Sequence, residues 1–168
     1  MSATIKVARN SRAVLPVEFL QRSALKDWEK KKVVVVAVPG AFTPTCHVNH
    51  IPAFVQHFKD FQAKGIDVVA VVAANDPFVM SGWGRINGAK DDVVFLTDPY
   101  AEWSKKLGIT ADLTDFGGLG LGYRTGRYAL VLNDNKVEKV LVEPNPGALE
   151  VSSAERVLAA IDELGWKK

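Results

Sequence analysis

Apolar residues gather in five short runs along the chain, each of the length of a buried β-strand. The runs span residues 33–38, 66–73, 93–97, 128–132 and 137–142. The second run is almost wholly apolar, which is typical of a strand that is covered on both faces of a sheet. Asn133, Asp134 and Asn135 separate the last two runs and favour a tight turn. We therefore expect these two strands to form an antiparallel hairpin.

Between these runs, apolar residues recur mostly at intervals of three and four, the spacing of a helix with one buried face. The predicted helices span residues 47–64, 76–86, 99–107 and 152–164. Pro52 lies inside the first helix and predicts a kink there. Asp76 and Ser152 begin helix-start patterns, and Gly108 stands where a glycine commonly ends a helix.

Strands that alternate with helices predict an α/β fold with parallel strand pairing. Together with the antiparallel hairpin at one edge, they indicate a thioredoxin-like fold, in which helices flank a central mixed sheet. The chain has no internal repeat, low-complexity tract or long linker, so we interpret residues 1–168 as one domain.

The first sixteen residues allow two interpretations. Residues 1–16 contain Lys6, Arg9 and Arg12 and no acidic residue, which is similar to a short mitochondrial targeting segment. Apolar residues such as Ile5 and Val7 also alternate with polar ones, as in an edge strand. Both alternatives stay open, and we expect a cytoplasmic protein with the mitochondrion as the alternative compartment.

Composition excludes several classes of protein. The chain has 168 residues, of which 48% are hydrophobic and 24% charged, as in an ordinary globular protein. Its net charge of +2 gives no reason to expect a nucleic-acid or membrane partner. No apolar run reaches the roughly 18 residues of a membrane helix. A single cysteine excludes a disulfide scaffold and fits a reducing compartment.

That single cysteine, Cys46, lies between a strand and a helix. Pro39 and Gly40 end the first strand-like run, and Pro44 suits the first turn of a helix. The thiol is thus expected at a helix start, where unpaired N–H groups and the helix dipole favour a thiolate over a thiol. By this position alone, a reactive thiol and an inert small apolar side chain remain equally open.

Two polar residues are candidates to act with the thiol. Thr43 lies one helical turn before Cys46, so its hydroxyl can lie beside the sulfur or hold a substrate oxygen. Arg127 opens a core strand, which is unusual for a guanidinium unless it faces an anion, and its charge would stabilise a thiolate. Arg124 could orient Arg127 or its carboxylate partner, and the glycine-rich stretch 117–122 is interpreted as a flexible loop that leads to Arg127.

Two other kinds of site use the same thiol. A metal site could draw on Cys46, His47, His50 and His57, but their spacing matches no familiar zinc pattern. A Cys–His hydrolase needs a histidine base beside the thiol, and all three histidines lie on the helix that carries it. We therefore expect no metal and no cofactor.

The motif Pro39-x3-Thr43-x2-Cys46 resembles the active-site loop of peroxiredoxins, in particular the fungal-like members of the type II (Prx5-like) group. The resemblance spans about residues 33–160, and also includes Asn75-Asp76-Pro77, Arg124-Thr125-Gly126-Arg127-Tyr128 and Glu143-Pro144. It is much more specific than a short glycine motif.

This resemblance implies a thiol-dependent peroxidase that reduces hydrogen peroxide and alkyl hydroperoxides. Cys46 would be the peroxidatic thiolate and would become a sulfenic acid. Thr43 would hydrogen-bond the peroxide, Arg127 would activate the thiolate, and Pro39 would limit access of water. The resemblance also implies a homodimer. A redox sensor or chaperone of the same fold, with little peroxidase turnover, is the alternative.

The chain departs from that family in three places. Val151 and Val71 stand where relatives keep a second cysteine, so the resemblance implies a one-Cys mechanism with an external thiol reductant, either glutathione with glutaredoxin or thioredoxin. Only 32 residues precede the active-site strand, without the family's usual Gly-Asp-x-x-Pro segment. His47 replaces a Ser or Thr, and we expect it to be a surface or interface residue rather than a base.

Overall fold

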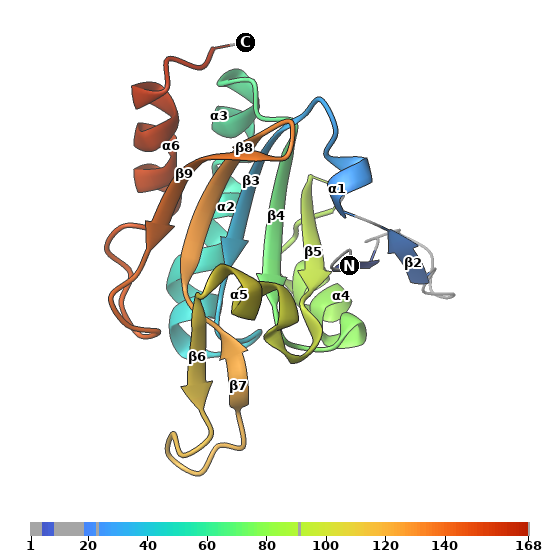
Figure 1. Cartoon of the computed structure of the whole chain (residues 1–168), viewed down its shortest axis with the longest axis vertical. Helices are drawn as coiled ribbons and strands as arrows, with labels where there is room; N and C mark the ends of the chain where they lie inside the picture. The colour runs from blue at the N-terminus through green and yellow to red at the C-terminus, as the bar shows by residue number, and fades with distance from the viewer. Residues whose placement is uncertain (1–4, 9–18, 23, 91, 168) are drawn as a thin grey trace.

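The computed structural model of the protein describes residues 5–8, 19–22, 24–90 and 92–167. Its centre is a seven-stranded sheet with the order β2-β1-β5-β4-β3-β8-β9 (Figure 1). The strands are β1 (Ile5–Ala8), β2 (Phe19–Arg22), β3 (Lys32–Ala37), β4 (Val68–Ala73), β5 (Val93–Thr97), β8 (Tyr128–Asn133) and β9 (Lys136–Val142). The three central strands pair in parallel, and β1 and β8 pair with them antiparallel. The predicted thioredoxin-like mixed sheet is confirmed.

The hairpin between β8 and β9 also forms as predicted. The two strands pair antiparallel over Tyr128–Asn133 and Lys136–Val142. Asp134 and Asn135 have φ values of 48° and 64°. Positive φ at both central residues is the geometry of the two-residue hairpin turn that follows the twist of the strands.

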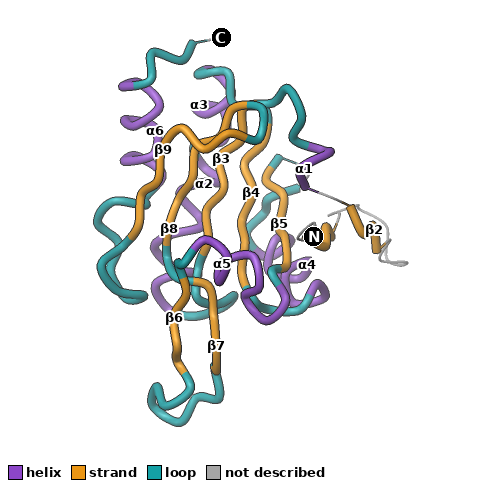
Figure 2. Tube along the Cα trace, in the orientation of Figure 1, coloured by secondary structure: helices purple, strands orange, loops and turns teal. Residues whose placement is uncertain are grey.

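Helices cover both faces of the sheet (Figure 2). They are α1 (Ala24–Asp27), α2 (Ile51–Gln56), α3 (Phe58–Ala63), α4 (Pro77–Ile86), α5 (Glu102–Leu107) and α6 (Ala154–Glu163), with a π-helical turn η1 (Thr45–His50) and a 3-10 turn η2 (Pro99–Ala101). One apolar cluster joins the sheet to η1, α2, α3, α4 and α6, and a second lies on the opposite face with α5.

The long predicted helix 47–64 is interrupted, but its kink is not where the sequence predicts it. The chain breaks at His57 (φ −88°, ψ 11°), between α2 and α3. Pro52 lies in the first turn of α2, just after the wide π-helical turn in which the N–H of Ile51 bonds to the Cys46 carbonyl. A proline inside a helix leaves one carbonyl without its N–H partner, and its ring clashes with the preceding turn. The change of helical register just before Pro52 removes both problems.

Other helix ends follow local signals. Asp76 caps α4 by accepting hydrogen bonds from the N–H groups of Phe78 (2.9 Å) and Val79 (3.1 Å). Gly108 ends α5 with a φ of 72°. The N-cap of α6 is Ser153 rather than Ser152, one residue later than predicted, because Ser152 is buried and bonds elsewhere.

A two-stranded arm was not predicted. Strands β6 (Thr110–Leu113) and β7 (Gly122–Thr125) pair with each other and project from one end of the molecule (Figure 1). The glycine-rich stretch 117–122 forms most of the turn at its tip, and its four glycines all have positive φ. The glycines therefore allow a tight turn that other residues rarely adopt.

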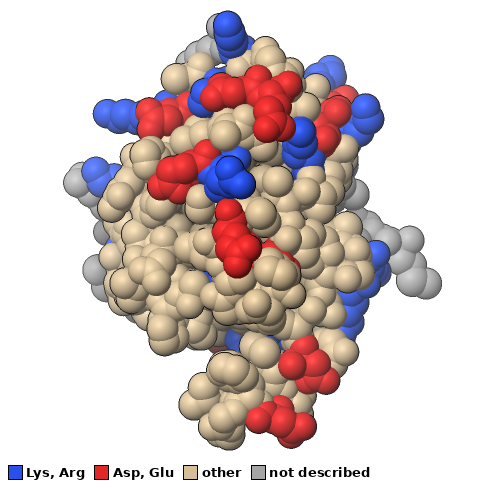
Figure 3. All heavy atoms as spheres, turned by 90° about the vertical axis from the view of Figure 1, so that its left-hand side faces the viewer, with Lys and Arg blue, Asp and Glu red and all other residues tan. Residues whose placement is uncertain are grey.

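The surface of the α6 side is divided by charge (Figure 3). Lysine, arginine and acidic side chains gather over its upper part, at the height of α6, and most of its lower part is uncharged. Among the described residues, no helix is both long and apolar enough to cross a membrane.

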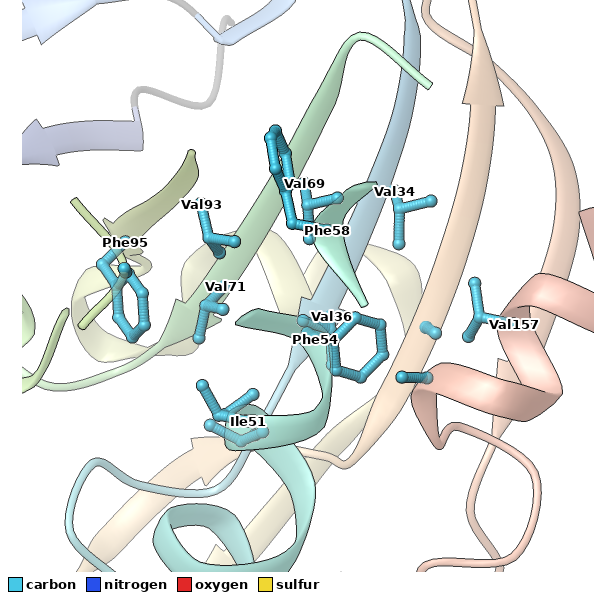
Figure 4. Close-up of a cluster of buried hydrophobic side chains, with 14 of the residues drawn as sticks. Val34, Val36, Ile51, Phe54, Phe58, Val69, Val71, Val93, Phe95 and Val157 are labelled. Atoms are coloured by element: carbon cyan, nitrogen blue, oxygen red, sulfur yellow. The ribbon is translucent and has the colours of Figure 1, made fainter. Parts of the chain in front are cut away.

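The main core lies between the sheet and the helices that follow Cys46 (Figure 4). Phe54 of α2 and Phe61 of α3 are fully buried and stack with a centroid distance of 5.6 Å. Both belong to the same buried cluster as Val36 and Val71 of the central strands, and Figure 4 shows Phe54 beside Val36. The predicted segment 1–16 lies mainly outside the described residues; Ile5–Ala8 form β1, which lies between β2 and β5.

Candidate active site

Cys46 is the second residue of the π-helical turn η1 and is fully buried. Strand β3 leads to it through a loop that is anchored to the sheet, because the N–H of Val38 bonds to Val72 (2.9 Å). The N–H of His47 donates to the carbonyl of Thr43 (2.8 Å) and closes the turn around the thiol. The predicted position of Cys46 at a helix start is therefore observed.

Arg127 is the charged group that faces the sulfur. Its Nη2 atom lies 3.4 Å from Sγ of Cys46, and the arginine is only 3% exposed. The same Nη2 and the Nε atom both donate to the carbonyl oxygen of Pro146, at 2.8 and 3.0 Å. This fork fixes the plane of the guanidinium, and a cation at that place stabilises the thiolate relative to the thiol.

His50 is the third member of the site, a role that the sequence did not indicate. Its Nδ1 atom lies 3.0 Å from Nη1 of Arg127, and its Nε2 atom lies 2.8 Å from the carbonyl of Ser152. Since an arginine only donates, Nδ1 must accept, and Nε2 carries the proton. Burial is the main reason why the pKa of His50 falls from 6.5 to about 4, and the nearby Arg127 adds to it. The ring is neutral at physiological pH.

Glu143 lies just outside this group, at the end of β9. The carboxylate accepts hydrogen bonds from the N–H groups of Glu150, Val151 and Ser152 and from the Ser152 hydroxyl, at 2.7 to 2.9 Å. Burial alone would raise the pKa of Glu143, but these hydrogen bonds outweigh it and the pKa lies below its ordinary value. An ionised carboxylate thus organises the loop between β9 and α6.

The two remaining predicted residues lie in the loop that precedes the thiol. Thr43 is half-buried, and its hydroxyl donates to the carbonyl of Gly40 (2.9 Å), so the lone pairs of its oxygen remain available as acceptors. A Cβ atom on Gly40 would lie only 3.1 Å from the Thr43 methyl group, so the loop is tightly packed at this point. Pro39 is buried.

Arg124 does not orient Arg127, contrary to the prediction. Its Nη1 atom donates to Oδ1 of Asn75 (3.3 Å), and its Nε atom donates to the carbonyl of Leu121 in the arm. The same Asn75 oxygen accepts from the N–H of Ala41 (2.8 Å). Arg124 therefore ties the arm to the active-site loop instead.

An aromatic group surrounds His47, the residue that follows the thiol. The indole N–H of Trp83 donates to Nδ1 of His47 (2.8 Å), and the ring of Phe42 lies 5.5 Å from that of His47. Phe42 is 46% exposed and has a φ of 63°, which is uncommon for a residue with a side chain. His47 is half-buried, and the hydrogen bond that its Nδ1 accepts holds its ring against Trp83.

The histidines do not form a metal cluster with the thiol. His57 bonds to Asp60 (2.7 Å) on the surface of the helical segment. Within the part of the chain that the structure describes, no three His, Cys, Asp or Glu residues are grouped as metal ligands.

Comparison with known proteins identifies the family of this site. The Redoxin family model matches residues 16–158. The "Putative peroxiredoxin prxA" of Emericella nidulans is 48% identical over 145 residues, which are 86% of this chain and 79% of the relative. The chain belongs to the peroxiredoxin family. A "Putative peroxiredoxin" of Malassezia furfur is 45% identical to this peroxiredoxin over 88% of this chain and 80% of its own.

Solved structures agree with this assignment. The structure described as "reduced Prx3 in complex with h2o2 from Vibrio vulnificus" has a TM-score of 0.84 and 35% identity, and the match covers 98% of this peroxiredoxin and 94% of that chain. The predicted resemblance to type II peroxiredoxins is thereby confirmed. Family membership supports a thiol-dependent peroxidase activity.

Relatives named for two compartments also match this peroxiredoxin. One is a "Putative peroxisomal peroxiredoxin" of Lipomyces kononenkoae, 43% identical over 81% of this chain and 79% of its own. The other is "Peroxiredoxin-2E, chloroplastic" of Arabidopsis thaliana, 47% identical over 78% of this chain and 55% of its own. The relatives that match this peroxiredoxin are therefore named for different compartments.

Proposed function

We propose that Cys46 is the peroxidatic residue of a one-Cys peroxidase that reduces hydrogen peroxide and alkyl hydroperoxides. The thiolate attacks the terminal peroxide oxygen, an S–O bond forms, and the O–O bond breaks. The products are a Cys46 sulfenic acid and an alkoxide or hydroxide, which takes up a proton and leaves as alcohol or water. The observation that carries this proposal is the guanidinium of Arg127, held 3.4 Å from the sulfur.

The neighbouring residues take the roles that this reaction requires. Arg127 stabilises the thiolate and then the negative charge that develops on the peroxide oxygens. Thr43 accepts the peroxide O–H, because its own proton is bonded to Gly40, and the backbone N–H of Cys46 is a further donor. Pro39 is buried in the loop and limits access of water. The peroxide enters on the side of Thr43, which is partly exposed.

The single cysteine supports reduction by an external thiol. Such a thiol attacks the sulfenic sulfur, forms a mixed disulfide and releases water, and a second thiol then releases reduced Cys46. Since Cys46 is fully buried, a bulky reductant needs the turn Thr45–His50 to open locally. Glutathione with glutaredoxin and thioredoxin are the two candidate reductants.

The proposal is tested by the second-order rate constant for oxidation of Cys46 by hydrogen peroxide and by an alkyl hydroperoxide. Both rates should exceed that of free cysteine by several orders of magnitude, and Cys46→Ser should abolish turnover while keeping the fold. Rates no faster than free cysteine would favour the redox-sensor or chaperone alternative. Turnover with glutathione and glutaredoxin, compared with thioredoxin, identifies the reductant.

A homodimer is also proposed. Exposed apolar side chains lie next to the thiol, at Phe42 (46%) and Val48 (67%), and on the arm, at Phe116 (61%) and Leu119 (65%). Exposed apolar patches commonly mark protein contacts. Light scattering should give the mass of a dimer, and Val48→Asp should convert it to a monomer with the same melting curve shape.

We also propose that the protein is cytoplasmic, with the mitochondrion as the alternative compartment. The lone cysteine suits the reducing cytoplasm, and the basic segment 1–16 is the reason to consider the mitochondrion. A C-terminal fluorescent fusion, made with and without residues 1–16, should be cytoplasmic in both forms. Mitochondrial fluorescence that is lost on removal of the segment would show that the alternative is correct.

A further inference from the structure

We propose that Glu143 is a positioning residue for the reactive thiol: its carboxylate clamps the loop 144–152, and this loop holds Arg127 and His50 in the arrangement that faces Cys46. The inference rests on the proposed function, since it concerns the same thiol. Glu143 does not contact the sulfur and acts only through the groups that do. Figure 2 shows the loop as the long connection between β9 and α6.

The carboxylate is almost completely engaged. Glu143 is 6% exposed, and four donors converge on it: the N–H groups of Glu150, Val151 and Ser152 and the hydroxyl of Ser152. Charge-assisted hydrogen bonds of this kind are roughly twice as strong as neutral ones. The backbone N–H of Glu143 also donates to the carbonyl of Arg127 (3.0 Å). One residue therefore joins the end of the loop to the strand position that carries the arginine.

The clamped loop supplies both acceptors that orient the site. The Pro146 carbonyl receives two donors of Arg127, at 2.8 and 3.0 Å. The Ser152 carbonyl receives Nε2 of His50, at 2.8 Å, and the N–H of this same Ser152 is bound by Glu143. His50 in turn presents Nδ1 to Arg127. Hydrogen bonds through Ser152, His50 and Arg127 thus link Glu143 to the sulfur.

The loop has a second internal support, which does not replace the first. The side chain of Asn145 accepts from the N–H groups of Gly147 (2.9 Å) and Ala148 (3.0 Å) and shapes the tip of the loop. The end that approaches α6 is held by Glu143. Without the carboxylate, three amides and one hydroxyl lose their acceptor, and the Pro146 and Ser152 carbonyls are free to shift. A displacement of about 1 Å at such a site can reduce a rate roughly 100-fold.

The test compares Glu143→Gln and Glu143→Ala with a matched control, Asp98→Asn. Asp98 is 2% exposed and accepts from the N–H groups of Trp103 and Ser104 and from the Ser104 hydroxyl. Its partners lie in α5, on the opposite face of the sheet from Cys46, so it serves as the control for losing a buried carboxylate clamp that does not hold the loop 144–152. For each variant, we would measure the rate of oxidation by hydrogen peroxide, the pH profile of Cys46 alkylation by iodoacetamide, and the melting temperature.

We expect the oxidation rate to fall roughly 10-fold in Glu143→Gln and roughly 100-fold in Glu143→Ala, with the alkylation midpoint moved to higher pH. Asp98→Asn should lower the melting temperature but change the rate by less than about twofold. In an Arg127→Ala background, Glu143→Gln should change the rate by less than about twofold, because the residue acts through the arginine.

Folded Glu143 variants that keep the wild-type rate and alkylation profile would overturn the inference, as would a full effect in the Arg127→Ala background. If Glu143→Ala does not fold, the nearly isosteric Glu143→Gln decides the matter. Alkylation needs no peroxide, so it tests Glu143 even if the wild-type protein reacts slowly with peroxide. Slow reaction of the wild-type protein with peroxide would contradict the proposed function. The alkylation profiles of the Glu143 variants would still decide whether Glu143 positions the thiol site.

Discussion

Nη2 of Arg127 lies 3.4 Å from Sγ of Cys46, although the two residues are 81 positions apart in the chain. Both are buried, and the guanidinium is held by the carbonyl of Pro146 and the neutral ring of His50. A cation that is fixed in this way needs no reorganisation when negative charge develops beside the sulfur. In the proposed mechanism, the rigid arginine therefore contributes as much as the thiol itself.

Removing the guanidinium should therefore impair both the thiolate and the transition state. In Arg127→Ala, we expect the rate of Cys46 oxidation by hydrogen peroxide to fall about 100- to 1000-fold. Stopped-flow measurement of Trp fluorescence would follow the oxidation rate, and alkylation at several pH values would follow the stability of the thiolate. The exposed Arg85 of α4 provides a matched control, and Arg85→Ala should keep the wild-type rate. An equal rate in both variants would contradict the role of Arg127.

The hydroxyl of Thr43 should matter as an acceptor. Thr43→Val keeps the shape of the side chain but removes the oxygen, so we expect the rate with hydrogen peroxide to fall roughly 10- to 100-fold. Thr43→Ser keeps the bond to Gly40 and should recover most of the rate. Circular dichroism would verify the fold of both variants. If serine is as slow as valine, the methyl packing and not the hydroxyl is what the site requires.

Buried neutral His50 makes stability depend on pH. Its pKa is near 6.5 in the unfolded chain and about 4 in the folded protein, where burial disfavours the charged ring. Between these two pKa values the unfolded chain binds more protons than the folded protein. The contribution of neutral His50 to the free energy of unfolding is therefore fully present above the unfolded pKa and is lost as the pH falls through the folded pKa. The difference corresponds to roughly 3 kcal/mol of unfolding free energy.

Urea denaturation at a series of pH values between about 7 and about 4 would measure this loss. His50→Gln should have lower stability at neutral pH but a much flatter pH dependence across that window. His57, which bonds to Asp60 at the surface, is the control, and His57→Gln should keep the slope of the wild-type protein. A wild-type protein whose stability does not change in this window would refute the expectation.

Gly126 allows the arm to pass close to the strand that carries Arg127. A Cβ atom there would lie 3.0 Å from Cγ2 of Ile109 and 3.3 Å from its carbonyl oxygen, and backbone cannot yield easily. We expect Gly126→Ala to cost about 1–3 kcal/mol of unfolding free energy, measured by thermal denaturation. Gly82, inside α4, has no heavy atom within 4 Å of its added Cβ. Gly82→Ala should instead stabilise the protein, by up to about 1 kcal/mol.

Much of the fold could be predicted from the sequence because its signals are local. Strand β5 was predicted with its exact bounds, 93–97, since an apolar run and its flanking turns are enough to define it. The hairpin turn at Asp134 and Asn135 was predicted for the same reason. The arm of β6 and β7 was missed, because its short strands pair only with each other and carry little apolar periodicity. The kink was predicted at Pro52 but lies five residues later, at His57. The π-helical turn Thr45–His50 precedes the proline and adapts the helix to it, and no local sequence pattern marks such a turn.

The sequence by itself identified the candidate pair, Cys46 and Arg127. Cys46 is the single thiol in the chain, and the spacing of Pro39, Thr43 and the strand-opening Arg127 indicated its chemistry before any contact was known. Only the tertiary structure decided what holds the pair together. Pro146, Ser152 and Glu143 contribute through backbone carbonyls and a loop clamp, and a carbonyl has no residue-type signal in a sequence. Their positions depend on the packing of the loop between β9 and α6 against the helix that carries the thiol, which no local pattern specifies.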